Sequence, residues 1–222
     1  MTPAPLPKRS LQAAADALRL LAACFYPPDP DLLREERVCE NLGASLEGFS
    51  PEASECARRL GASLADTRPE DLRVEHARLF LGPFEVAAPP YGSVYRDGPK
   101  VLMGPSTLAV QRAYREAGLT LASDFHEVPD HVAAELEFAA YLLAGGAGDE
   151  SAAAEAFLRE HLLPWAPAFC DRVEAESQSD FYTALARCLR AGLRDLAAAL
   201  SAAPAGEGAG GGATGPRPHA SP

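Results

Sequence analysis

The stretch PDHVAAELEFAAYLL, residues 129–143, decides the fold. Its apolar side chains fall on nearly every side of a helix, interrupted only by Glu135 and Glu137. A helix that is apolar almost all round is normally buried among other elements. Pro129 and Asp130 are typical of a helix N-terminus, where a missing N–H and a negative charge are both favourable. The stretch therefore predicts a buried helix over residues 129–145.

Helical periodicity continues on both sides of this segment. Apolar residues recur at helical spacing from Leu11 to Phe25, with Ser10 as the expected N-cap and prolines from Pro27 onward ending the helix. Further helices are predicted over residues 30–47, 51–65, 69–81, 105–117, 150–163, 165–176 and 179–201. A chain of 222 residues can bury a core without disulfides or a metal. We therefore expect an all-α, single-domain bundle of about eight or nine helices over residues 10–202.

The two ends of the chain differ from this body in composition. Residues 1–9 are rich in proline, and residues 203–222 are rich in glycine and proline and contain no aromatic residue. Such a segment cannot bury enough apolar surface to offset the entropy of ordering its chain. We expect a loose N-terminus over 1–9 and a disordered tail over 203–222.

One long interruption divides the helical pattern at residues 82–104, where glycines and prolines recur. An irregular stretch of this length inside a compact domain is uncommon and is often functional. The Asp97-Gly98 pair is a turn signal that would suit a short hairpin. Tyr91 and Tyr95, with Ser93 between them, either pack into the core or form peptide-binding surface, because amphipathic aromatics suit both. We expect one long irregular loop here.

The charge balance excludes several classes of partner. Twenty basic and 31 acidic residues give a net charge of −11 and a pI near 4.9. This argues against nucleic-acid binding and against docking on anionic lipid. No apolar stretch reaches the roughly 18 residues of a membrane span, and Asp16 and Arg19 interrupt the segment that would otherwise resemble an export signal. The acidic surface either serves solubility or attracts a cationic partner.

Acidic residues gather without any basic residue between positions 124 and 137. They are Asp124, Glu127, Asp130, Glu135 and Glu137. Carboxylates on a buried helix need partners. Two alternatives stay open: arginines from elsewhere in the chain pair with them, or they form an acidic pocket beside an apolar wall. Such a pocket would suit a peptide that carries both arginine and hydrophobic residues.

Catalytic and metal-binding patterns find little support. His126 and His131 are five residues apart with Pro129 between them, so they do not form the HExxH zinc motif. A metal on His131 and Glu135 competes with the simpler alternative of a side-chain pair within one helical turn. The five cysteines have no zinc or redox spacing, and no nucleophile or phosphate-loop motif is present. We expect reduced thiols and no enzyme.

Two groups of motifs, in order along the chain, resemble one known family. PYGSVY at residues 90–95 is followed by VLMGPSTLAV at 101–110, and EVPDHVAAELEF at 127–138 contains an E-x-P-D-H signature. LFLGP at 79–83 and HLLPW at 161–165 also fit. On these motifs, residues 10–201 resemble the TorD/DmsD-like molybdoenzyme maturation chaperones. Gly92 departs from the pattern, since many members have an acidic residue there, and both loop aromatics are Tyr where some members have Trp.

The resemblance implies an all-helical cytoplasmic chaperone with no cofactor of its own. Such proteins bind the precursor of a molybdoenzyme catalytic subunit, through its twin-arginine signal peptide and nearby regions, until molybdopterin guanine dinucleotide is inserted before export. Some members bind guanine nucleotide weakly and some form swapped dimers, so we expect a monomer or a swapped dimer. By motif match, the expected peptide-binding residues are Tyr91, Ser93, Tyr95, Asp124, Glu127, Pro129, Asp130 and His131.

Two other functions remain as alternatives at this stage. A helical nucleotide hydrolase would use Asp124 or Glu127 to position water, and the absence of a phosphate loop counts against it. A general helical scaffold would bind folded partners and would not distinguish a precursor from its signal-less mature form.

Overall fold

The computed structural model describes residues 8–82, 86–119, 128–145 and 150–202, and within these ranges it contains helices and no strand. The elements are α1 (Lys8–Phe25), α2 (Pro30–Glu35), α3 (Val38–Leu46), α4 (Pro51–Asp66), α5 (Pro69–His76), the π-helical turn η1 (Ala77–Leu81), α6 (Gly92–Arg96), α7 (Pro105–Glu116), α8 (Val132–Leu143), α9 (Glu150–Phe157), the π-helical turn η2 (Leu158–Leu162), α10 (Ala166–Glu176) and α11 (Asp180–Ser201). The predicted all-α class is confirmed, with more and shorter helices than expected.

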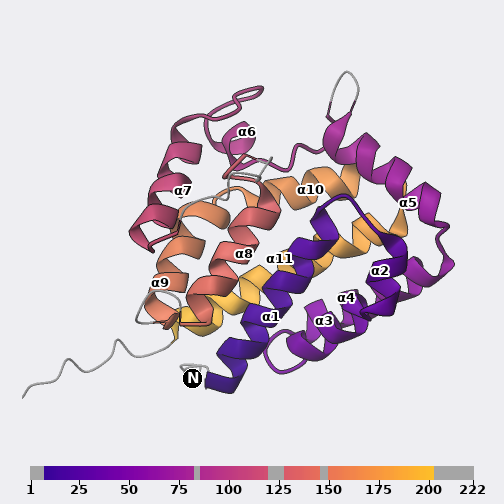
Figure 1. Ribbon diagram of the computed structural model, residues 1–222, viewed down its shortest axis with the longest axis horizontal. Helices are drawn as coiled ribbons and strands as arrows, with labels where there is room; N and C mark the ends of the chain where they lie inside the picture. Colours follow the sequence, from indigo (N-terminus) through magenta and orange to yellow (C-terminus); the bar gives the residue numbers. More distant parts are fainter. Residues whose placement is uncertain (1–7, 83–85, 120–127, 146–149, 203–222) are drawn as a thin grey trace, which may run out of the picture.

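Helix α8 lies inside the bundle, as its sequence predicts. Figure 1 shows α1 running alongside α8 on one side and near α3 on the other, while α11 packs against α4, α10 and α9. All residues of α8 are buried except Glu137 and the half-buried Tyr141. The first helical residue is Val132, three positions after the expected start, because His131 serves as the N-cap. The Ala-rich faces of α1 and α8 allow the two helices to approach closely.

Three local predictions are wrong, each for a physical reason. The helix expected over 30–47 is two helices, because Arg37 adopts a left-handed conformation (φ 51°) between α2 and α3. Helix α1 begins at Lys8, so Ser10 lies within it. The loop is not wholly irregular: residues 92–96 form α6, and no hairpin follows among the described residues. Instead the Asp97 carboxylate accepts hydrogen bonds from the backbone N–H and the hydroxyl of Ser106, at the start of α7.

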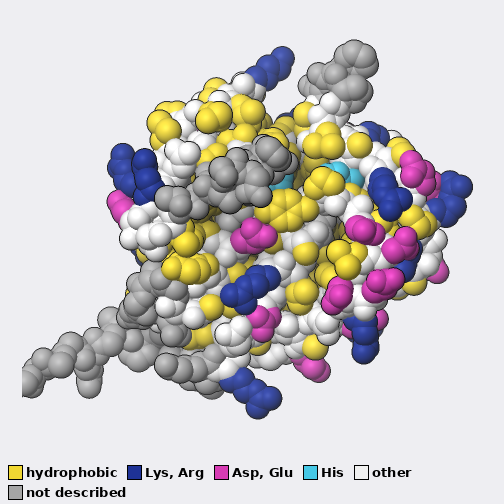
Figure 2. Space-filling model, in the orientation of Figure 1, with side chains coloured by type: hydrophobic (Ala, Val, Ile, Leu, Met, Phe, Trp, Pro, Cys, Tyr) yellow, Lys and Arg dark blue, Asp and Glu magenta, His cyan; other side chains and the backbone are white. Residues whose placement is uncertain are grey.

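The surface over α2–α5 carries acidic and basic side chains side by side (Figure 2). Several of them form ion pairs one helical turn apart, such as Arg68 with Asp71 and Arg78 with Glu75. The five cysteines are free, and four of them are buried. Within the described part of the chain, no helix has the length and hydropathy to cross a membrane. Of the expected loose N-terminus, residues 1–7 lie outside the described residues and residues 8–9 belong to α1. The tail expected over 203–222 also lies outside the described residues.

Candidate functional site

Backbone pairing joins the loop before α6 to the N-terminus of α8. The Gly92 N–H donates to the carbonyl of Asp130 at 2.9 Å, and the Val132 N–H donates to the carbonyl of Pro90 at 2.8 Å. Tyr91 and His131 thereby form an isolated antiparallel bridge. Two segments that lie 40 residues apart in the sequence, each carrying one of the two motif groups, are therefore adjacent in space.

Asp130 connects these segments through its side chain as well. The residue is only 1% exposed, and its Oδ2 accepts a 2.6 Å hydrogen bond from the Ser93 N–H in the first turn of α6. Among the described residues, its Oδ1 has no hydrogen-bond partner, and neither has the hydroxyl of Ser93. Asp130 is thus a buried carboxyl with one satisfied and one unsatisfied oxygen, which is an unusual arrangement in a native protein.

His131 is the N-cap of α8 and is 4% exposed. Its Nδ1 accepts a 3.1 Å hydrogen bond from the Ala133 N–H, which assigns the neutral ring proton to Nε2. The imidazole stacks on Tyr26 at 5.8 Å and meets Tyr91 edge-on at 5.4 Å. Burial, together with the neighbouring His76 charge, lowers the pKa of His131 to about 4. A histidine can sense physiological pH when its pKa lies near 6–7, and the lowered pKa of His131 does not support such a pH-sensor hypothesis for the free protein.

The remaining predicted residues line the same region. Pro129 is buried, and its carbonyl accepts a 2.9 Å hydrogen bond from the Tyr114 hydroxyl. Tyr95 stacks on Trp165 at 5.7 Å, and its hydroxyl is buried without a partner, so burial raises the pKa of Tyr95. Asp124 and Glu127 lie outside the described residues. The structure brings the other six predicted residues together. Ser93, Pro129, Asp130 and His131 are buried, and Tyr91 and Tyr95 are half-buried.

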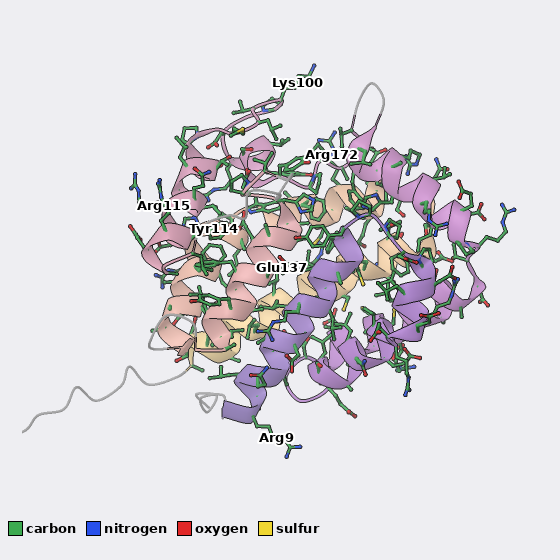
Figure 3. All side chains as sticks on the ribbon, viewed as in Figure 1. Arg9, Lys100, Tyr114, Arg115, Glu137 and Arg172 are labelled. Atoms are coloured by element: carbon green, nitrogen blue, oxygen red, sulfur yellow. The ribbon has the colours of Figure 1, made fainter. Side chains whose placement is uncertain are left out.

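The acid cluster is not neutralised by arginines within the described residues. No ion pair reaches Asp130, Glu135 or Glu137, although many other acids of the chain have one. Glu137 accepts a 3.2 Å hydrogen bond from the Tyr26 hydroxyl, and Figure 3 shows Glu137 on the side of α8 that faces α1. For these three acids, internal arginine pairing is not seen within the described residues, and Asp130 and Glu135 are each only 1% exposed.

Sequence analysis missed three contributors to this site. Tyr26, which follows α1, stacks on His131 from more than 100 positions away. Trp165 underlies Tyr95 and approaches Gly92. Glu135 was recognised as one of the acids but not as part of the site. A lone tryptophan within a family motif was the one signal that could have pointed to Trp165.

The described residues offer no evident catalytic or metal centre. No group of three or more His, Cys, Asp or Glu residues among them is placed to hold a metal ion. Burial raises the pKa of the thiols of Cys39 and Cys170, to about 11 and about 12, so these cysteines are poor nucleophiles.

Comparisons with known proteins match most of the chain. The family model described as the nitrate reductase delta subunit matches residues 46–171. The Tat proofreading chaperone DmsD of Salmonella typhi is 33% identical over 82% of this chain and 88% of its own length. The chaperone protein TorD of Photobacterium profundum is 32% identical over 62% of this chain and 69% of its own.

A solved structure from Archaeoglobus fulgidus, described as a candidate redox enzyme maturation protein, has a TM-score of 0.53 and 25% identity. It covers 79% of this chain and 92% of its own. The family model spans more than half of the chain and DmsD more than four-fifths. The chain therefore belongs to the TorD/DmsD-like family of molybdoenzyme maturation chaperones, and it is a chaperone rather than an enzyme.

Proposed function

We propose that this chaperone binds the precursor of a molybdenum-dependent oxidoreductase subunit in the cytoplasm, through its twin-arginine signal peptide and nearby regions. It holds the precursor until molybdopterin guanine dinucleotide has been inserted, before export. Relatives named Tat proofreading chaperones support the choice of a twin-arginine precursor. The cofactor belongs to the client, and we propose no resident cofactor for this chain.

The observation that carries the proposal is the partly unsatisfied Asp130 carboxyl beside an aromatic wall. A guanidinium presents several N–H donors in one plane and pairs well with a carboxylate that has an open oxygen. Tyr91 and Tyr95 supply half-buried rings on which the apolar run of a signal peptide can pack. The binding unit is proposed to be a monomer or a swapped dimer.

Calorimetry with a synthetic twin-arginine leader from a molybdoenzyme precursor tests the proposal. We expect micromolar or tighter binding that weakens with salt and weakens further when both arginines are replaced by lysine. Asp130→Asn keeps an oxygen for the Ser93 N–H but loses the charge, and should cost about 1–3 kcal/mol of binding free energy. Asp31→Asn, an exposed change of equal charge on α2, is the matched control and should bind like the wild type.

Two results would contradict the proposal. Absence of leader binding to the folded wild type would remove the signal peptide as the ligand. Equal affinity for the precursor and for its signal-less mature form would favour a general scaffold instead. Unchanged affinity in a folded Asp130→Asn variant would remove only Asp130 from the site.

A further inference from the structure

A group of buried polar atoms without partners surrounds the first residues of α6. It comprises the hydroxyls of Ser93 and Tyr95, Asp130 Oδ1, both carboxyl oxygens of Glu135 and the indole Nε1 of Trp165. Buried polar atoms in native proteins are nearly always hydrogen-bonded. Six such atoms around the start of one helix, without a partner among the described residues, indicate a site that an added group can complete.

Gly92 lies against two of these groups, the Trp165 indole and the Glu135 carboxyl. A Cβ placed on Gly92 would lie 3.0 Å from Trp165 Nε1 and 3.3 Å from Glu135 Oε1, so both side chains face the glycine. The next residue, Ser93, receives the Asp130 carboxylate through its N–H. Tyr95 covers the indole ring of Trp165. Glu135 and Trp165 therefore meet at Gly92, and the Asp130 carboxyl lies against the next residue of the same turn.

The composition of the cluster determines what can complete it. Once Glu135 is ionised, the three carboxyl oxygens can only accept, the two hydroxyls can accept or donate, and Trp165 Nε1 can only donate. An anion would face two carboxyl groups, and a neutral apolar group would leave every atom unsatisfied. A planar cation with several N–H donors, a guanidinium, satisfies most of these acceptors at once.

Glu135 is the deepest member of the cluster. It is 1% exposed, lies one turn into α8 and has no ion pair among the described residues. The exposed Arg96 of α6 influences it electrostatically without pairing with it. Other titratable groups around α8 include Asp130, His131 and Glu137 on or beside it, Tyr114 on α7, His161 on η2, and Tyr26 and His76 from the first half of the chain. No ion pair joins any of them to Glu135 among the described residues.

We propose that Glu135 is a second, deeper acceptor for an arginine of the client's leader, and that this arginine enters as Glu135 releases a proton to solvent. The inference rests on the proposed function and adds a residue that determines specificity. The exchange is balanced: the neutral carboxylic acid loses H⁺ to the buffer, and the resulting carboxylate pairs with the entering guanidinium. The net charge inside the cluster does not change.

The electrostatics of the free protein agree with this exchange. Burial, and then the nearby Asp130, raise the pKa of Glu135 well above its ordinary value, whereas the Trp165 indole and Arg96 oppose the rise only in part. The indole N–H is close to the carboxyl but does not meet hydrogen-bond geometry. A guanidinium in contact would favour the charged form, so leader binding must be linked to proton release.

The test is calorimetry of the synthetic leader in buffers of different ionisation enthalpy. The wild type should release up to one proton per leader bound, and its affinity should rise by up to about tenfold per pH unit while free Glu135 stays protonated. Glu135→Gln should abolish the release and weaken binding by about tenfold or more. Glu70→Gln, an exposed acid on α5 outside the site, is the matched control and should keep both properties.

The outcomes separate this inference from the proposed function. If the wild type binds the leader but releases no proton, or if Glu135→Gln binds and releases protons like the wild type, Glu135 has no role in binding. If the leader does not bind at all, the proposed function itself falls. Should Glu135→Gln fail to fold, the proton count of the wild type still decides.

Discussion

Glu75 and Glu135 are both buried glutamates, yet their surroundings are opposite. Glu75, 7% exposed, accepts hydrogen bonds from Arg78 Nε at 2.7 Å and Nη2 at 2.8 Å, and from the Gln178 N–H at 2.6 Å. Burial alone would raise the pKa of Glu75, but these bonds outweigh it and lower the pKa. Glu135 has none of them, and its pKa is raised.

The difference shows how to distinguish a structural acid from a candidate binding acid. Glu75 has an arginine three residues later on the same helical face, which is a local and sequence-encoded partner. Glu135 lies in a segment without any basic residue. An unpaired buried carboxyl lowers stability, so its presence calls for an explanation outside the folding of the isolated chain.

The largest effect is expected at Glu75. The Glu75 carboxylate holds Arg78 and, through the Gln178 N–H, ties α5 to the segment before α11. Glu75→Gln removes its charge and should lower the free energy of unfolding by about 2–4 kcal/mol. This range is below that of a fully buried pair because the Arg78 side chain is 33% exposed. The lowered pKa means that the carboxylate stabilises the fold above its ordinary pKa and that this is lost as the pH falls through the folded value. Urea unfolding of the wild type and of Glu75→Gln at pH 7 measures the loss of stability.

The control for this prediction is Glu70→Gln on the same helix. Glu70 is exposed, and its Oε2 lies 3.8 Å from Arg73 Nη1. The free energy of unfolding should therefore change by no more than about 0.5 kcal/mol. Equal losses at the two positions would show that burial does not distinguish them.

The opposite sign is expected at Glu135. Glu135→Leu removes a buried polar group without partners and should raise the free energy of unfolding at pH 8 by about 1–3 kcal/mol. In the wild type, the raised pKa means that the contribution of Glu135 to stability is greatest below 4.5, its ordinary pKa, and falls by up to about 1.4 kcal/mol per pH unit above it. The leucine variant should lose this slope in urea unfolding between pH 5 and 8. A destabilised variant would mean that Glu135 has a structural partner after all.

These contrasts also show what sequence can and cannot predict here. The periodic segments of α1, α8 and α11 were predicted because one local pattern determines each helix. The pairing of Tyr91 with His131 and the stacking of Tyr26 on His131 depend on tertiary contacts between distant segments, which no local pattern contains. Motif resemblance placed Ser93 and Asp130 in one site, but only the structure reveals that both are buried.

A moderate effect is expected at His131. Like Glu135 it is buried, and like Glu75 it has a hydrogen-bond partner, because its ring accepts from the Ala133 N–H as the N-cap of α8. Its pKa of about 4 means that stability is present above 6.5, the ordinary value, and is lost as the pH falls toward 4. His131→Ala should cost about 1–2 kcal/mol through the lost cap and ring stacking. His131→Asn should recover part of this, because asparagine also caps α8.

Nuclear magnetic resonance of the imidazole provides the direct check on His131. The ring should remain neutral from pH 8 down to pH 5, with the proton on Nε2. A midpoint between 6 and 7 in the free protein would restore the pH-sensor hypothesis and would show that the site is more hydrated than the burial of His131 indicates.

The smallest effect is expected at Glu137, an exposed acid on the same helix as Glu135 that does have a partner. Partial desolvation raises the pKa of Glu137, and the Tyr26 hydroxyl opposes this through its 3.2 Å hydrogen bond. Tyr26→Phe keeps the ring that stacks on His131 but removes the donor, so it should raise the pKa of Glu137 further. A double-mutant cycle with Glu137→Gln should give a coupling of about 0.5 kcal/mol, because the pair is exposed. A coupling as large as the effect at Glu75 would mean that this edge of the acid cluster is structural, and it would confine the candidate arginine site to Asp130 and Glu135.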